Sequence, residues 1–309
     1  MATLLEMPVE ILRVILALAV GGLEHFNLTL PTFPAATEDG VDGYITSPSF
    51  WRDDIKLARR WSRIDSIPTL LVNRWLHRET MDAIRLLPEK YCYTMDMMIV
   101  NELYMYATWL SIPAPTDQVE KVTVTVRTID AYHALDEKTR RRNMFRGGDG
   151  GPCAFAHHIH DLLNKFFLYG PVSRANDSQF AVKALKTLEL NILSPDLPEE
   201  QFVPRGTTPI HRIYKVRSES SDNKVFLVHP EYLTSLFGEF ITRLLAGDTR
   251  RDFKSLLFEG VETIRLMLDG KLRQEWEVAV LLCHADAEFL AEMREIRCAK
   301  GLAVPLVKE

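Results

Sequence analysis

Residues 119–126 read Val-Glu-Lys-Val-Thr-Val-Thr-Val. An apolar residue, two polar residues and then strict alternation predict a β-strand with one buried face, because successive side chains of a strand point to opposite sides. The same pattern returns in residues 185–192 and 261–268, and in a less regular form in residues 91–100. We therefore expect these four segments to be strands of one sheet.

Helices are expected between and after these strands. Apolar residues at three- and four-residue steps predict helices over residues 155–168, 230–246 and 274–298. The second has the most regular apolar stripe, which runs from Leu233 to Leu245. Alternating strands and helices predict a mixed α and β protein of the α/β class, with a mostly parallel sheet and helical crossovers.

The strand pattern also matches the strand portion of leucine-rich repeats. In those proteins the pattern recurs about every 20–29 residues, whereas here the segments that begin at Val119, Leu185 and Val261 are much further apart. The sequence thus predicts an irregular, leucine-rich-repeat-like sheet instead of a regular repeat array.

Helices dominate the expected structure before this sheet. Proline suits the first position of a helix, so a helix is expected from Pro8 to about Val20. Further helices are expected over residues 51–64 and 68–87, where apolar residues recur at helical spacing among charged ones.

The chain therefore divides into a helical region and an α/β region. Residues 1–88 form a helical region, and residues 24–50, rich in proline and glycine, form a loop inserted in it. Residues 89–309 form the α/β region.

Composition excludes several classes of protein. The chain has 309 residues, of which 47% are hydrophobic, and its formal net charge is −5. It therefore lacks the basic balance typical of nucleic-acid-binding domains. The apolar run from Ile11 to Val20 is short and interrupted by Arg13, which argues against a signal peptide or a membrane span. The four cysteines contain no CxxC pair, which indicates reduced thiols and a cytoplasmic or nuclear protein.

Two stretches carry a resemblance to a known family. Residues 7–16 read Met-Pro-Val-Glu-Ile-Leu-Arg-Val-Ile-Leu, and residues 70–79 read Leu-Leu-Val-Asn-Arg-Trp-Leu-His-Arg-Glu. The first resembles the opening of an F-box. The second is similar to the helix that follows this opening in uncharacterised fungal F-box-like proteins.

This resemblance implies a protein-interaction role without catalysis. Pro8, Ile11, Leu12, Ile15 and Leu16 would contact the adaptor of a cullin-type ubiquitin ligase. The α/β region would then bind an unknown protein substrate, and no cofactor would be needed. One alternative is an orphan scaffold protein with a degenerate F-box.

The first helix supports two interpretations on physical grounds. Ile11, Ile15 and Leu18 form one apolar stripe, and Leu12 and Leu16 begin another. One side could pack on the protein's own core while the other meets a partner's groove. Alternatively, both sides are buried within the same domain.

No recognisable catalytic motif is present. His157, His160 and Asp161 share a helix face and form the densest group of possible metal ligands, but no further ligand is indicated, so we expect no metal site. Cys283 and its neighbours do not have the geometry of a catalytic group on one helix. The basic segment 138–146 and the glycine-rich segment 147–151 are interpreted as a solvated loop and a turn. An enzyme whose site has no local motif is the third alternative.

Overall fold

The computed structural model describes residues 7–20, 55–57, 73–87, 89, 91–129, 144–145, 153–171, 181–203, 227–246, 251–283 and 287–304. Their helices and strands follow in the order α1 (Val9–Val20), β1 (Ile55–Leu57), α3 (Arg74–Leu86), β2 (Cys92–Val100), β3 (Tyr104–Ser111), β4 (Gln118–Ile129), α5 (Ala154–Tyr169), β5 (Ala184–Leu193), the 3₁₀-helix η6 (Glu199–Gln201), α7 (Pro230–Ala246), α8 (Arg251–Gly260), β6 (Val261–Leu268), β7 (Lys271–Glu277), α9 (Val278–Leu282) and α10 (Ala287–Ala299).

The described strands form one mixed sheet in the order β1-β3-β2-β4-β5-β6-β7. Its four central strands, β2, β4, β5 and β6, are parallel and follow one another in chain order. This confirms the parallel arrangement predicted for the four strand segments. The hairpins β2–β3 and β6–β7 are antiparallel, and they make the sheet mixed.

The apolar positions of the shared sequence pattern lie in register across the sheet. Val122 lies opposite Leu188, and Leu188 lies opposite Ile264. The next apolar positions, Val124 and Leu190, pair in the same way. Because side chains directly opposite one another lie on the same face, this register builds one continuous apolar surface.

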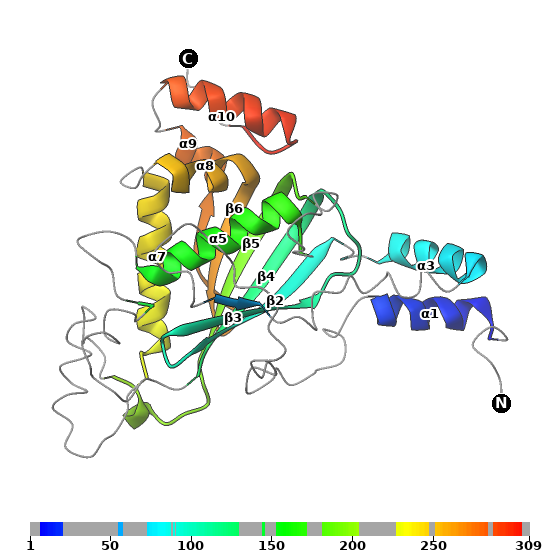
Figure 1. The fold of residues 1–309 in the computed structure, drawn as a ribbon, viewed down its shortest axis with the longest axis horizontal. Coiled ribbons are helices and arrows are strands. Elements are labelled where there is room, and N and C mark those ends of the chain that lie inside the picture. The colour runs from blue at the N-terminus through cyan, green and yellow to red at the C-terminus, as the bar shows by residue number, and fades with distance from the viewer. Residues whose placement is uncertain are drawn as a thin grey trace.

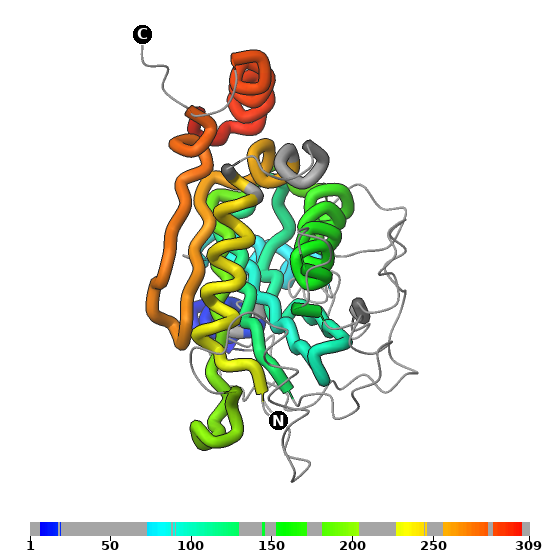
Figure 2. The backbone as a smooth tube through the Cα atoms, turned by 90° about the vertical axis from the view of Figure 1, so that its left-hand side faces the viewer, coloured from blue at the N-terminus to red at the C-terminus, as the bar shows by residue number. Residues whose placement is uncertain are grey.

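Helices cover that apolar surface on one side of the sheet (Figures 1 and 2). Phe155 of α5 and Phe237 of α7 stack with their ring centroids 4.2 Å apart. Both belong to the same hydrophobic core as Leu188 and Ile264 of the sheet. One core thus joins the helices α5 and α7 to the strands β5 and β6. The helices α9 and α10 lie at the end of the sheet where β6 begins (Figure 1).

Two sequence expectations for helices are wrong in part. Gln274–Glu277, expected to open a long helix, belongs to β7, and the helices α9 and α10 follow it. A tight turn causes this difference: Asp269 and Gly270 both have positive φ and reverse the chain, so that Trp276 pairs with Ile264. Ile55–Leu57, expected to be helical, is a short strand beside β3.

The helices α1 and α3 pack on each other to one side of the sheet (Figure 1). Leu12 and Leu16 of α1 form a small hydrophobic cluster with Leu76 and Ala83 of α3, against which Trp75 also packs. Ile84, near the end of α3, belongs to a separate cluster with Ala114, next to Tyr91. The pair thus has its own core and joins the sheet region through the last turn of α3.

The sequence predicted these two helices in outline. The observed α1 agrees with the expected start near Pro8, and α3 begins at Arg74 with Asn73 as its N-cap, whose Oδ1 accepts a 2.8 Å hydrogen bond from the Leu76 N–H. Residues 68–72 of the expected helix, the inserted loop 24–50 and most of the expected helix 51–64 lie outside the described residues.

Candidate interaction surface

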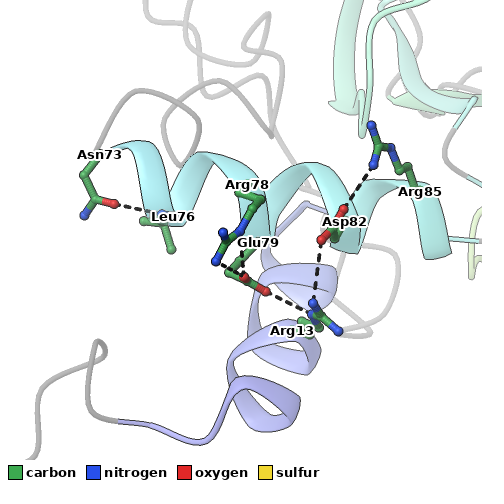
Figure 3. A network of polar contacts seen from close by, with 7 residues as sticks. All are labelled: Arg13, Asn73, Leu76, Arg78, Glu79, Asp82 and Arg85. Atoms are coloured by element: carbon green, nitrogen blue, oxygen red, sulfur yellow. Dashed lines mark hydrogen bonds and ion pairs between the residues drawn. The ribbon is translucent and has the colours of Figure 1, made fainter.

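An ion-pair network fixes α1 against α3 (Figure 3). The Arg13 Nε lies 3.0 Å from an Oε of Glu79, and its Nη2 lies 3.6 Å from an Oδ of Asp82. Arg78 and Arg85 complete the network from α3 itself, with N–O distances of 3.3 Å to Glu79 and 3.2 Å to Asp82. A buried carboxylate requires such partners, because an unpaired charge away from water is costly.

This network and the small hydrophobic cluster set which side of α1 faces solvent. Leu12 and Leu16 are buried against α3. Ile11 and Val14 keep 52% and 57% of their surface exposed. Three-residue spacing places Ile11 and Val14 on one helix face, so α1 has an exposed apolar strip opposite its packed side.

The residues that the F-box resemblance implied are therefore divided between two places. Pro8 and Ile11 are exposed and Ile15 is half-buried, which leaves all three within reach of a partner. Leu12 and Leu16 are buried in the α1–α3 contact. Val14 was not singled out from the sequence, although its spacing from Ile11 is the signal that would have found it. The side chain of Leu18 lies outside the described residues.

The sheet face opposite the helices is polar. Thr123 lies opposite Glu189, and Glu189 lies opposite Arg265. Arg265 continues the row to β7, where its Nε lies 2.7 Å from an Oε of Glu275. Most of these side chains are partly exposed, so the central strands present a ladder of hydroxyl and charged groups on this face.

One ion pair on this polar face is buried. Arg127 of β4 donates to both carboxylate oxygens of Asp96 on β2, at 2.8 and 2.5 Å. Asp96 is fully buried, and a bidentate guanidinium–carboxylate pair supplies the hydrogen bonds that such burial demands. The pair joins β2 to β4 beside the exposed part of the ladder.

The histidine group lies on α5 and is not arranged as a metal site. His157, His160 and Asp161 are half-buried, and the Nδ1 of His160 is 3.8 Å from the Oδ1 of Asp161. Within the described residues, no three His, Cys, Asp or Glu side chains come together as ligands for a metal ion. Cys153 precedes α5 as a buried thiol whose pKa is raised by desolvation.

His158, between these residues, is the unusual member of the group. It is buried, and desolvation lowers its pKa from 6.5 to about 4. Its Nε2 has no hydrogen-bond partner among the described residues. Such a group stays neutral at physiological pH, which fits a core position better than proton transfer at a site open to solvent.

An apolar cavity of about 30 Å³ lies beneath α5 and α7. Its walls include Phe155, Leu188, Phe237 and Ile264. A cavity of this kind is too small for an organic substrate, and it offers no set of convergent polar groups. It is therefore a gap in the packing of the core.

The remaining sequence candidates contribute no assembled site. Cys283 is an exposed residue at the end of α9, and its neighbours 284–286 lie outside the described residues. Within the basic segment only Met144 and Phe145 are described, and both are buried in the core. Residues 147–151 lie outside the described residues.

Arg297 of α10 is a structural residue that the sequence did not indicate. It is fully buried, and it donates hydrogen bonds to the backbone carbonyls of Phe258, Val261 and Ala303, at 2.5 to 2.8 Å. Burial lowers its pKa to about 10, which leaves it a cation at neutral pH. The side chain fastens α10 to the end of α8 and the start of β6.

Among the described residues, no helix combines the length and the apolarity needed to cross a bilayer. The chain matches no family model, no curated protein and no solved structure.

Proposed function

We propose that the chain is an F-box-like interaction subunit, which docks on the adaptor of a cullin-type ubiquitin ligase through α1 and binds a protein substrate through its sheet. The observation that carries the proposal is the exposed apolar strip of Ile11 and Val14. Grouped apolar side chains that remain exposed mark interaction sites. A helix that presents them to solvent suits binding in a partner's hydrophobic groove.

The packing of α1 supports this mode of binding. A docking helix must hold one orientation, or binding has to order it at a cost in free energy. Here Arg13 bridges to Glu79 and Asp82 of α3, and Leu12 and Leu16 fill the contact between the helices. The strip is thereby presented in a fixed direction by a small and separate helix pair.

The exposure of the α1 side chains decides which of them we propose as contacts with the adaptor. Pro8, Ile11, Val14 and Ile15 meet the adaptor. Leu12 and Leu16 act indirectly, because they hold α1 on α3. In this role the chain works in the cytoplasm or nucleus, and the ligase complex supplies the chemistry.

The proposed substrate surface is the polar face of the sheet. Parallel strands in chain order, with helices on one face, are features that the sheet shares with leucine-rich-repeat proteins. On the described residues of β4, β5 and β6, side chains of the opposite face are partly exposed and lie within reach of a partner. The ladder that contains Thr123, Glu189 and Arg265 would supply the polar contacts of that interface.

The test is a binding titration of the purified chain against the adaptor, by calorimetry or interferometry. Wild type is compared with Ile11→Asp, Val14→Asp and Ile15→Asp. Val280→Asp on α9 is the matched control, because Val280 is also an apolar side chain with 54% of its surface exposed, on a different element. Circular dichroism and thermal melting establish that each variant is folded.

Saturable binding by wild type and Val280→Asp, weakened at least about tenfold in the α1 variants, supports the proposal, since charged substitutions at a buried interface centre cost several kcal/mol. Equal binding by all variants would place the adaptor elsewhere on the chain. Absence of binding by wild type would contradict the proposal and favour the orphan scaffold.

A further inference from the structure

We propose that Ser194 is a phosphorylation site for a proline-directed protein kinase, and that its phosphate loosens the turn of the β6–β7 hairpin. Ser194 follows the last residue of β5 and is exposed. Pro195 comes directly after it. A serine followed by proline is the minimal sequence that kinases of this class phosphorylate.

The chain around Ser194 has the accessibility that a kinase needs. A residue before proline favours an extended backbone, which is the conformation in which protein kinases bind their substrates. Residues 194–198 belong to no helix or strand, and all of them except Pro195 are exposed. A kinase can therefore reach Ser194 without unfolding a regular element. Two similar pairs in the sequence, Ser47-Pro48 and Thr208-Pro209, lie outside the described residues.

Asp269 holds Ser194 from the turn between β6 and β7. Its Oδ1 accepts a hydrogen bond from the Ser194 N–H, and its Oδ2 accepts one from the Ser194 hydroxyl, both at 2.7 Å. Asp269 and Gly270 have positive φ values of 51° and 73°, a combination typical of tight two-residue hairpin turns. Ser194 is thus a direct partner of this turn.

Two further hydrogen bonds fasten the same turn to β5. The Asp269 N–H donates to the carbonyl of Ile192 at 2.9 Å, and the Gly270 N–H donates to the Oδ1 of Asn191 at 3.0 Å. Figure 2 shows the β6–β7 hairpin, drawn in orange, at the margin of the molecule. Hydrogen bonds at the surface each contribute little, so a change at Ser194 affects a substantial share of the attachment.

Phosphorylation replaces attraction between Ser194 and Asp269 by repulsion. The γ-phosphoryl group of ATP passes to the Ser194 Oγ: a new O–P bond forms, the bond from the γ-phosphorus to ADP breaks, and the hydroxyl proton passes to the kinase's catalytic base. The phosphate carries a charge of about −1.5 to −2 at neutral pH, and the Oγ no longer donates a hydrogen bond. Beside the Asp269 carboxylate this charge is repelled, which drives the turn away from the end of β5.

The hairpin also carries part of the polar face of the sheet. Arg265 of β6 and Glu275 of β7 form an ion pair on that face. A loosened turn would reduce the order of this part of the face. Phosphorylation would thereby regulate substrate binding. This last consequence rests on the proposed function, whereas the phosphorylation site does not.

The first experiment determines whether Ser194 is modified. The full chain is incubated with ATP and a purified mitogen-activated protein kinase, and its peptides are analysed by mass spectrometry. We expect phosphate on Ser194 and none on Ser235 of α7, an exposed serine with a bonded hydroxyl that precedes leucine instead of proline. In Ser194→Ala the signal should disappear, while phosphate on Ser47 or Thr208 would remain. Absence of phosphate on Ser194, under conditions that modify a control peptide, would overturn the proposal.

The second experiment measures the effect on the turn. Phosphoserine is incorporated at position 194 during synthesis, and amide hydrogen exchange is compared with that of the unmodified chain. We expect at least about threefold faster exchange in peptides from residues 261–277 and no change in α7.

Asp269→Asn is the matched control for the repulsion. Asparagine suits the same turn and its amide can donate to the phosphate, so phosphoserine should not accelerate exchange in this variant. Equal acceleration in Asp269→Asn, or none with Asp269 in place, would contradict the mechanism. These measurements involve no adaptor or substrate, so their outcome is independent of the proposed function.

Discussion

The α1–α3 pair and the sheet region are held together in different ways. The sheet region has one core that unites aromatic and aliphatic side chains from its strands and from α5 and α7. The helix pair has a small cluster of its own, reinforced by ion pairs to Glu79 and Asp82. The sheet region exposes a polar strand face, whereas α1 exposes apolar side chains.

This difference separates the region that carries most of the stability from the region that we propose as the binding element. A large core makes the sheet region a cooperative unit in which local changes are felt throughout. A small contact of few apolar residues opens locally at lower cost. We therefore expect the helix pair to open more readily than the sheet region. Its exposed apolar strip on α1 is what an element that gains part of its burial from a partner would present.

The largest effect is expected from truncation in the sheet core. Phe237→Ala removes a ring stacked on Phe155, and we expect the free energy of unfolding to fall by about 3–5 kcal/mol. Denaturant unfolding followed by circular dichroism measures it. Leu16→Ala in the small cluster should cost about 2–3 kcal/mol and open only the helix pair. Equal, global destabilisation by both changes would remove the distinction between the regions.

An intermediate effect is expected from acid. His158 has a folded-state pKa of about 4, below the ordinary 6.5, so the unfolded chain takes up its proton first as the pH falls. The contribution of neutral His158 to the free energy of unfolding is fully present above pH 6.5 and is lost as the pH falls towards 4. We expect it to amount to on the order of 2–3 kcal/mol.

The variant His158→Leu checks the origin of this acid sensitivity. Unfolding free energies are measured by denaturant titration from pH 7 to 4, and the loss should be smaller in the variant than in wild type. His77→Gln on the exposed side of α3 serves as the control and should retain the full loss. The assignment is contradicted if His158→Leu loses as much stability as wild type over this range.

The smallest effect is expected from the ion-pair network. Glu79→Gln removes the charge that Arg13 and Arg78 share, while the amide keeps the shape of the side chain. Loss of about 1 kcal/mol from the contact should speed amide hydrogen exchange in α1 by about fivefold without changing the sheet. Mass spectrometry of peptides from residues 9–20 detects this, and unchanged α1 exchange would show that the network contributes nothing to the contact.

The periodicity of apolar residues predicted the central fold well. The shared pattern in residues 119–126, 185–192 and 261–268 correctly gave three parallel strands, because a strand buried on one face leaves a clear alternation. The hairpin strands β3 and β7 were not predicted. β3 has little alternation of polar and apolar residues. β7 follows the Asp269–Gly270 turn, a sequence typical of tight hairpins, and this signal was overlooked because the charged residues after it do not alternate with apolar ones.

The candidate surface was predicted only in part, for a geometric reason. Sequence periodicity showed that α1 is apolar on two sides, but it did not show which side packs on α3. That choice depends on Glu79 and Asp82, which lie far away in the chain and pair with Arg13 only after folding. Buried polar residues such as Arg297 likewise give no periodic signal, since their role is to bind backbone carbonyls of distant segments.

In the function that we propose, α1 docks on a partner through its exposed strip. Hydrogen exchange of the wild-type chain, alone and with the cullin-ligase adaptor in excess, tests it most directly because it locates the contact without substitution. We expect slower exchange in residues 9–20 and unchanged exchange in α7, within residues 230–246. Slower exchange confined to the sheet region, or none anywhere, would contradict it.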